Sequence, residues 1–137
     1  MITEPTVINF PKIGNPGLGY ISLAENQTLP FSVNRIYWTY YTPEQVLRGS
    51  HAHHNLEQIL IALSGTIVVN TEMPNGEKHT FILDSPDRGV YVPKYTWHVM
   101  RYSHNAVQMS IASMVYEEQD YIRDYNDFLA INNKLIK

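Results

Sequence analysis

The sequence predicts an all-β protein, an antiparallel β-barrel followed by one C-terminal α-helix. Short runs rich in Val, Ile, Thr, Tyr and Phe recur along the chain, which is typical of strands. Turn-forming sequences separate these runs, among them Asn15-Pro16-Gly17, Ser64-Gly65 and Asn75-Gly76. The last segment instead repeats apolar residues at steps of three and four, which is the period of a helix.

The strand-forming runs are spaced as in a sandwich or barrel. They are Thr6–Phe10, Leu18–Leu23, Phe31–Tyr41, Leu56–Leu63, Thr66–Thr71, Lys78–Leu83, Gly89–Val92, His98–Tyr102 and Ala106–Val115. Asn75-Gly76 is a pair that turns a tight hairpin, so the runs on either side of it should pair. The helix is expected to begin at Glu117, Glu118 and Asp120, whose negative charge suits a helix N-terminus. Its apolar stripe consists of Tyr121, Ile122, Tyr125, Phe128 and Leu129.

Length and composition favour a single globular domain over residues 1–137. Hydrophobic residues make up 44% and charged residues 17% of the chain, which argues against disorder. A net charge of -3 gives no basic surface for nucleic acid. The chain has no cysteine, which excludes disulfides, thiol chemistry and thiolate metal sites. Neither a signal peptide nor a membrane span is evident, so a cytoplasmic protein is expected.

The segment RGSHAHHNLEQ, residues 48–58, concentrates the residues with the richest chemistry. If it forms a strand, His51 and His53 share one face, while Ala52 and His54 share the other. His98 begins a later strand and could enter the same cavity. Two or three imidazoles on one inner face are then available to bind a metal or to transfer protons.

The residues alone leave both kinds of site open. His51, His53, Glu57 and His98 match the ligand set of metal-binding cupins and would suit iron, manganese, nickel or zinc. Arg48 favours proton transfer on a substrate without a metal, because its permanent charge repels a cation and suits an anionic substrate.

Five segments resemble, in order, those of the dTDP-sugar 3,4-ketoisomerases, over about residues 7–128. They are VINFPKI, NQTLPFSVNRIYWTY, RGSHAHHNLEQILIALSGTI, LDSPDRGVYVPKYTWHVM and YEEQDYIRDYNDF. The resemblance implies a cupin-type jelly roll with no metal and no cofactor. It also implies a homodimer that exchanges N-terminal strands, for which Thr6 to Leu23 would be the arm.

The resemblance further implies the reaction. The substrate would be dTDP-4-keto-6-deoxyglucose and the product a dTDP-3-keto-6-deoxyhexose, used to make a 3-amino-3,6-dideoxyhexose for a bacterial surface glycan. His51 and His53 would carry the protons, and Glu57 would orient an imidazole. His98 matches the histidine of galacto-forming members, so a galacto product is expected, although Gly17 lies in a loop that departs from the family pattern.

Binding of the nucleotide requires cations for the diphosphate and an aromatic face for the base. The expected substrate-binding residues are Arg35, Arg48, Arg88, Tyr37, Trp97, His98 and Glu57. Two other classes of protein remain as alternatives. One is a metal-dependent cupin, a dioxygenase or a sugar isomerase, and the other is a non-catalytic sugar-binding cupin.

Overall fold

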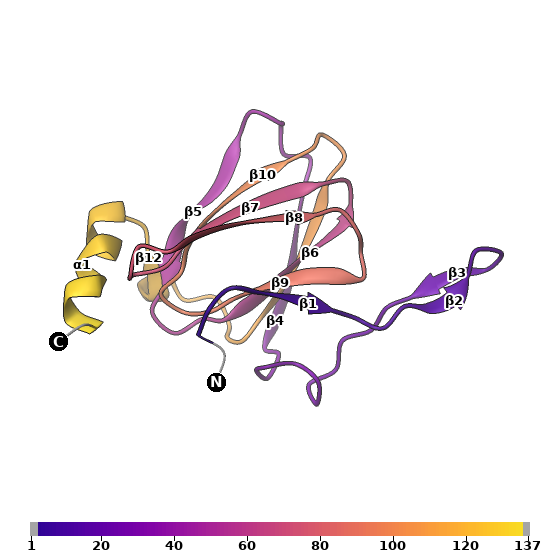
Figure 1. Ribbon diagram of the computed structural model, residues 1–137, viewed down its shortest axis with the longest axis horizontal. Helices are drawn as coiled ribbons and strands as arrows, with labels where there is room; N and C mark the ends of the chain where they lie inside the picture. The colour runs from indigo at the N-terminus through magenta and orange to yellow at the C-terminus, as the bar shows by residue number, and fades with distance from the viewer. Residues whose placement is uncertain (1–2, 136–137) are drawn as a thin grey trace.

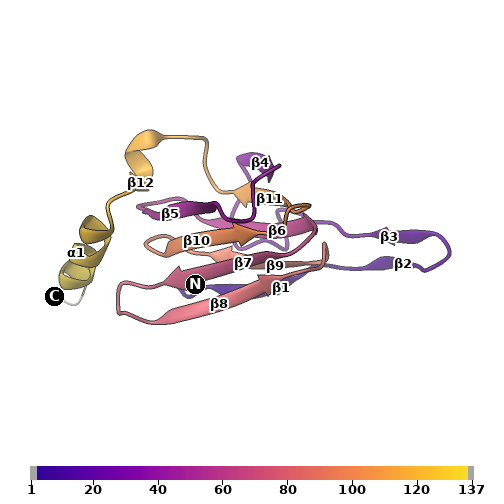
Figure 2. The same ribbon diagram turned by 90° about the horizontal axis from the view of Figure 1, so that it is seen from above.

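The computed structural model describes residues 3–135 as two antiparallel sheets that face each other. The first sheet has the order β1-β9-β6-β11-β4 and the second β12-β5-β10-β7-β8. The strands of the first are β1 (Thr6–Asn9), β9 (Arg88–Val92), β6 (Gln58–Ser64), β11 (Val107–Ala112) and β4 (Arg35–Tyr40). Those of the second are β12 (Tyr121–Ile122), β5 (Leu47–His53), β10 (Trp97–Tyr102), β7 (Ile67–Glu72) and β8 (Lys78–Leu83). The all-β prediction is confirmed (Figures 1 and 2).

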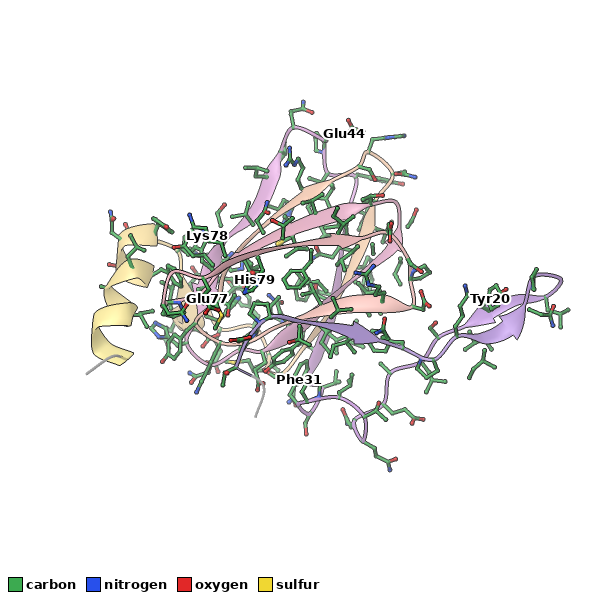
Figure 3. All side chains as sticks on the ribbon, in the orientation of Figure 1. Tyr20, Phe31, Glu44, Glu77, Lys78 and His79 are labelled. Atoms are coloured by element: carbon green, nitrogen blue, oxygen red, sulfur yellow. The ribbon has the colours of Figure 1, made fainter. Side chains whose placement is uncertain are left out.

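A separate hairpin and one helix complete the described chain. The hairpin is formed by β2 (Ile13–Asn15) and β3 (Gly19–Ile21) and projects from the barrel, with the 3-10 turn η1 (Glu118–Asp120) and helix α1 (Tyr125–Leu135) at the other end (Figures 1 and 2). Tyr20 marks the projecting hairpin in Figure 3. Helix α1 begins at Tyr125 because the Asp124 carboxylate accepts hydrogen bonds from the first free backbone N–H groups of the helix.

The space between the sheets is apolar over one part and polar over the other. The apolar part is filled by Leu60, Ala62, Ile67, Val69, Leu83, Val90, Val92, Met100, Tyr102 and Ala106. Side chains alternate between the two faces of each strand, so a residue two positions along the strand from a core residue also faces inward. Gln58 on β6, Ser110 on β11 and His98 on β10 are such residues, and they form a polar interior next to the apolar core.

Both outer faces are partly covered by other segments of the chain. Ala52 on β5 and Ile122 on β12 pack outward against Phe128 of α1, so a small residue at position 52 does allow the outer layer to pack closely. On the other sheet, a loop that includes Phe31 covers Ile59 and Tyr91.

The strand predictions hold for the nine runs, with ends that move by up to several residues. Three strands not among those runs are Ile13–Asn15, Leu47–His53 and Tyr121–Ile122. The helix prediction is wrong before Tyr125. Glu118–Asp120 is a 3-10 turn and Tyr121–Ile122 pairs with β5, because the Asp120 carboxylate binds backbone of the β5–β6 loop instead of starting a helix.

The N-terminal arm also differs from the expectation. Thr6–Asn9 pairs with β9 of its own chain, so only the hairpin Ile13–Ile21 projects. Residues 16–18 close this hairpin, in which Asn15 pairs with Gly19. Among residues 3–135, no helix has the length and apolar character needed to cross a membrane.

Candidate active site

A β-bulge in β5 creates the side-chain pattern of the RGSHAH segment. His51 pairs with His98 and Gly49 pairs with Val99, which leaves Ser50 as the extra residue. Gly49 and Ser50 both have left-handed backbone, with φ values of 84° and 58°. A Cβ atom on Gly49 would lie 2.8 Å from the carbonyl oxygen of His98, so only glycine fits there.

The bulge places Arg48 and His51 on the same side of the sheet. Arg48 pairs with Met100 and His51 pairs with His98, and both partners face the interior. Without the extra residue, an odd spacing of three would put the two side chains on opposite faces. The bulge therefore explains how a cation and an imidazole three residues apart serve one site.

Three imidazoles meet on this inner face. The ring centroid of His51 lies 4.7 Å from that of His98 and 4.9 Å from that of His53. One nitrogen from each of the three rings lies within 4.8 Å of the others. The prediction that His98 lies on the same inner face as His51 and His53 is confirmed.

The Nδ1 atom of each imidazole has a hydrogen-bond acceptor. The acceptors are the Gly49 carbonyl for His51, the Asp120 carboxylate for His53 and the Thr96 carbonyl for His98. The hydrogen of a neutral ring is therefore held on Nδ1, and the lone pair is on Nε2. None of the described residues forms a hydrogen bond with Nε2 of His51 or His53, which leaves both lone pairs free.

His98 is held differently from the other two. Its Nε2 accepts a hydrogen bond from the side-chain amide of Gln58 at 3.1 Å. The orientation of this amide is fixed by Tyr37, whose hydroxyl donates to Gln58 Oε1 at 2.7 Å. His98 is only 1% exposed, so it is a buried wall of the site without a free lone pair.

Burial keeps the imidazoles neutral. Burial, then the neighbouring His98 and His53, lower the pKa of His51 to about 2. Burial, then His98 and Arg35, lower the pKa of His53 to about 3. The pKa of His98 is also lowered, mainly by burial. At neutral pH, His51 and His53 are therefore proton acceptors.

Two of the predicted arginines lie beside the histidines. The guanidinium of Arg35 lies 5.0 Å from the ring centre of Tyr37, and its buried Nε has no partner among the described residues. Burial raises the pKa of Tyr37, and the charges of Arg35 and Arg48 act against that increase. Arg35, Tyr37 and Arg48 thus line the same inner region as the histidines.

Three predicted site residues lie elsewhere. Trp97 points to the outer face and packs on Tyr125 and Phe128 of α1, so the structure does not bring this expected substrate-binding residue to the histidines. Glu57 binds the Tyr91 hydroxyl, away from the histidines, so the prediction that it orients an imidazole is wrong. Arg88 faces inward at the far end of β9, about 13 Å along the strand from Val92, the neighbour of Gln58.

Asp120, Gln58 and Tyr121 belong to the site but were not predicted. Tyr121 packs against His51 and His53, with centroid separations of 4.9 and 4.5 Å. The guanidinium of Arg123 covers the Tyr121 ring at 4.1 Å, and Glu118 holds Arg123. Asp120 and Tyr121 come from the segment that resembled a helix start, and the pairing of Tyr121–Ile122 with β5 has no local signal in the sequence.

Comparisons with known proteins identify the family of this chain. A family model described as "WxcM-like, C-terminal" (FdtA) matches residues 3–133. The TDP-4-oxo-6-deoxy-α-D-glucose-3,4-oxoisomerase of Aneurinibacillus thermoaerophilus is 40% identical over 126 residues, 91% of this chain and 90% of that protein. A 3,4-ketoisomerase from Helicobacter canadensis is 34% identical, with a TM-score of 0.90 over 96% of this chain and 99% of that one.

The TDP-quinovose 3,4-ketoisomerase of Campylobacter jejuni is also similar, with 33% identity, a TM-score of 0.87 and coverage of 94% of this chain and 99% of that one. The family match, over residues 3–133, spans nearly the whole described chain. The chain belongs to the FdtA family and is a sugar-nucleotide 3,4-ketoisomerase.

Proposed function

We propose that the enzyme converts dTDP-4-keto-6-deoxyglucose into a dTDP-3-keto-6-deoxyhexose, with His51 and His53 transferring the protons. The observation that carries this proposal is the pair of free Nε2 lone pairs on two neutral imidazoles, 4.9 Å apart at their centroids. Two bases at this separation can serve adjacent carbon atoms of one sugar. The substrate named for the relative from Aneurinibacillus thermoaerophilus supports this choice.

The chemistry is an enolisation followed by its reverse at the neighbouring carbon. The C-4 ketone acidifies the hydrogen on C-3, and a neutral imidazole removes it. The C-4 oxygen takes up a proton to give the enediol. A proton is then returned to C-4 while the hydroxyl on C-3 loses its proton, which leaves the ketone on C-3. No hydrogen or electron pair is gained or lost overall.

Charge that develops on the enediol oxygens requires donors in place before the reaction. Arg35 is suited to this role, because its buried Nε–H has no other partner in the described chain. Arg48 is more exposed and is suited to the diphosphate, whose negative charge a guanidinium binds with two parallel hydrogen bonds. Arg88 is too distant to contribute to the reacting carbons.

We propose the galacto configuration for the product. His98, the histidine found in galacto-forming members of the family, supports it. Both nitrogens of His98 are engaged, so its influence is exerted through the position of the His51 ring rather than by protonating C-4. Trapping the product with a 3-aminotransferase tests the reaction and the configuration together. A small H-3/H-4 coupling is expected, and a large diaxial coupling would identify the gluco product instead.

We also propose that the enzyme is a homodimer in which the hairpin Ile13–Ile21 of each subunit packs against the other subunit. The hairpin makes no strand pairing with its own barrel and exposes Ile13, Leu18, Tyr20 and Ile21. The outer face of edge strand β4 exposes Ile36, Trp38 and Tyr40. A second copy of the chain would cover both apolar surfaces.

Light scattering should report a dimer. Trp38→Arg should weaken this dimer, and Ile82→Arg, on the opposite sheet, should not. A fully active stable monomer would contradict the dimer.

One observation favours a metal-dependent cupin as the second candidate, namely the three imidazole nitrogens within 4.8 Å of one another. Two features of the donor set fit it less well. Glu57, the carboxylate of the expected ligand set, binds Tyr91, and the Gln58 amide occupies Nε2 of His98. Metal analysis of protein purified without chelators separates the candidates, because near-stoichiometric iron, manganese or nickel that is needed for activity would favour the metal enzyme.

A further inference from the structure

Among the residues that the structure describes, the Asp120 carboxylate is the one charged group that contacts a histidine ring of the site directly. Its Oδ2 lies 3.1 Å from Nδ1 of His53, and both side chains are buried, each residue being 4% exposed. The corresponding acceptors for His51 and His98 are neutral backbone carbonyls. His53 therefore differs from the other two imidazoles in what faces its Nδ1.

Several other contacts fix the position of the Asp120 carboxylate. The backbone N–H groups of Asn55 and Leu56 donate to the same carboxylate at 2.7 and 3.2 Å. Next to Asp120, Tyr121 pairs with His53 across β12 and β5. The carboxylate is thus fixed in position before a substrate binds, and little reorganisation is needed when His53 becomes charged.

We propose that Asp120 is a positioning residue that acts through His53. It holds the hydrogen of the neutral ring on Nδ1, so that the Nε2 lone pair faces the site, and it stabilises the imidazolium that forms when Nε2 takes a proton. This inference rests on the proposed role of His53 in proton transfer. It makes the Asp120–His53 pair a distinct functional unit beside His51.

Asp120→Asn tests the proposal, because an amide has one acceptor and one donor end. The shorter contact, to the Asn55 N–H at 2.7 Å, favours the amide oxygen at that place. The amide NH2 group then faces Nδ1 of His53 and moves the ring hydrogen to Nε2, which removes the free lone pair. The kcat should fall about a hundredfold or more, with little change in KM.

Asp124→Asn is the matched control. Asp124 also accepts two backbone hydrogen bonds, from Asn126 and Asp127, but does so at the start of α1 without an imidazole. The change from carboxylate to amide is the same in both variants, but only at residue 120 does it face an imidazole. Only Asp120→Asn should lower kcat.

The tautomer of His53 can be measured without activity, by long-range ¹H–¹⁵N correlation spectra of the ¹⁵N-labelled enzyme. We expect hydrogen on Nδ1 in the wild type and on Nε2 in Asp120→Asn. Hydrogen on Nε2 in the wild type would overturn the proposal even if the variant fails to fold. An unchanged tautomer in Asp120→Asn would overturn it as well. A changed tautomer with unchanged kcat would show that Asp120 does not position a catalytic group, and would refute the role of His53 while leaving the assigned reaction in place.

Discussion

The side-chain amide of Gln58 donates a hydrogen bond to Nε2 of His98, at a distance of 3.1 Å in the protein interior. Each residue is 1% exposed. Because Nδ1 of His98 already donates to the Thr96 carbonyl, this contact engages the second and last nitrogen of the ring. The three histidines of the site are therefore not equivalent, and only His51 and His53 keep a free lone pair.

Replacing Gln58 by Leu should lower the free energy of unfolding. The change removes the partner of two buried polar atoms, Nε2 of His98 and the Tyr37 hydroxyl, and each unsatisfied group costs about 1–3 kcal/mol. Urea denaturation measures the loss. Gln45→Leu, at an exposed position, is the control and should be close to neutral. Equal stability of the two variants would mean that the Gln58 contacts do not hold His98.

Replacing Gly49 by Ala should disrupt the bulge of β5. Alanine would be strained at φ 84°, and its Cβ would lie 2.8 Å from the His98 carbonyl. Displacement of Arg48 or His51 by about 1 Å should reduce kcat/KM about a hundredfold. Ser50→Gly is the matched variant, because glycine suits the left-handed backbone at residue 50 and keeps the bulge. It should remain active, and full activity of Gly49→Ala would contradict the role given to the bulge.

Replacing Arg48 by Ala should raise KM more than it lowers kcat, because a guanidinium that binds phosphate contributes equally to the ground state and the transition state. Arg101→Ala is the control, since Arg101 lies on the neighbouring strand β10 but faces outward. Steady-state kinetics of both variants provide the comparison. A large fall in kcat with unchanged KM would instead place Arg48 at the developing enediolate.

The buried histidines should make the protein less stable in mild acid. Burial lowers the pKa of His53 to about 3 and also lowers that of His98, whereas in the unfolded chain both imidazoles take up protons below about pH 6.5. As pH falls from 6.5 to 5, proton uptake by the unfolded state should lower the unfolding free energy by up to about 1.4 kcal/mol per pH unit for each histidine. Urea denaturation at several pH values in this range gives the unfolding free energy, which should fall less steeply with falling pH in His53→Asn than in the wild type. An identical pH dependence would mean that His53 does not take up a proton on unfolding.

Much of the fold and part of the site follow from local patterns in the sequence. The period-two runs and the Asn75-Gly76 turn predicted the β7–β8 hairpin, and Lys78–Leu83 was predicted to the residue. The alternation of His51 and His53 predicted their shared face correctly. Simple alternation from Arg48 to His51 gives opposite faces, and the bulge puts the two residues on the same face.

The errors come from contacts between residues distant in the chain. Glu57 and Gln58 are adjacent, so their side chains point to opposite faces of the sheet. Gln58 faces inward and contacts His98, and Glu57 faces outward and contacts Tyr91. Asp120 is 67 positions from His53, and its negative charge looked like that of a helix start. Sequence spacing identified which residue types were available, but the register of β5, β6 and β12 decided which of them meet.

If His51 and His53 move protons between C-3 and C-4 through an enediol, hydrogen from the solvent should appear in the product. The enzyme is incubated with dTDP-4-keto-6-deoxyglucose in deuterated water, and NMR follows the deuterium content of C-4 in the first product formed. We expect deuterium at C-4 in the wild-type reaction, since a proton held on an imidazole exchanges with water. Product formation should be slowed about a hundredfold or more in both His51→Asn and His53→Asn. Product that carries the original C-3 hydrogen at C-4, with no deuterium, would mean a direct hydride shift and would contradict the account.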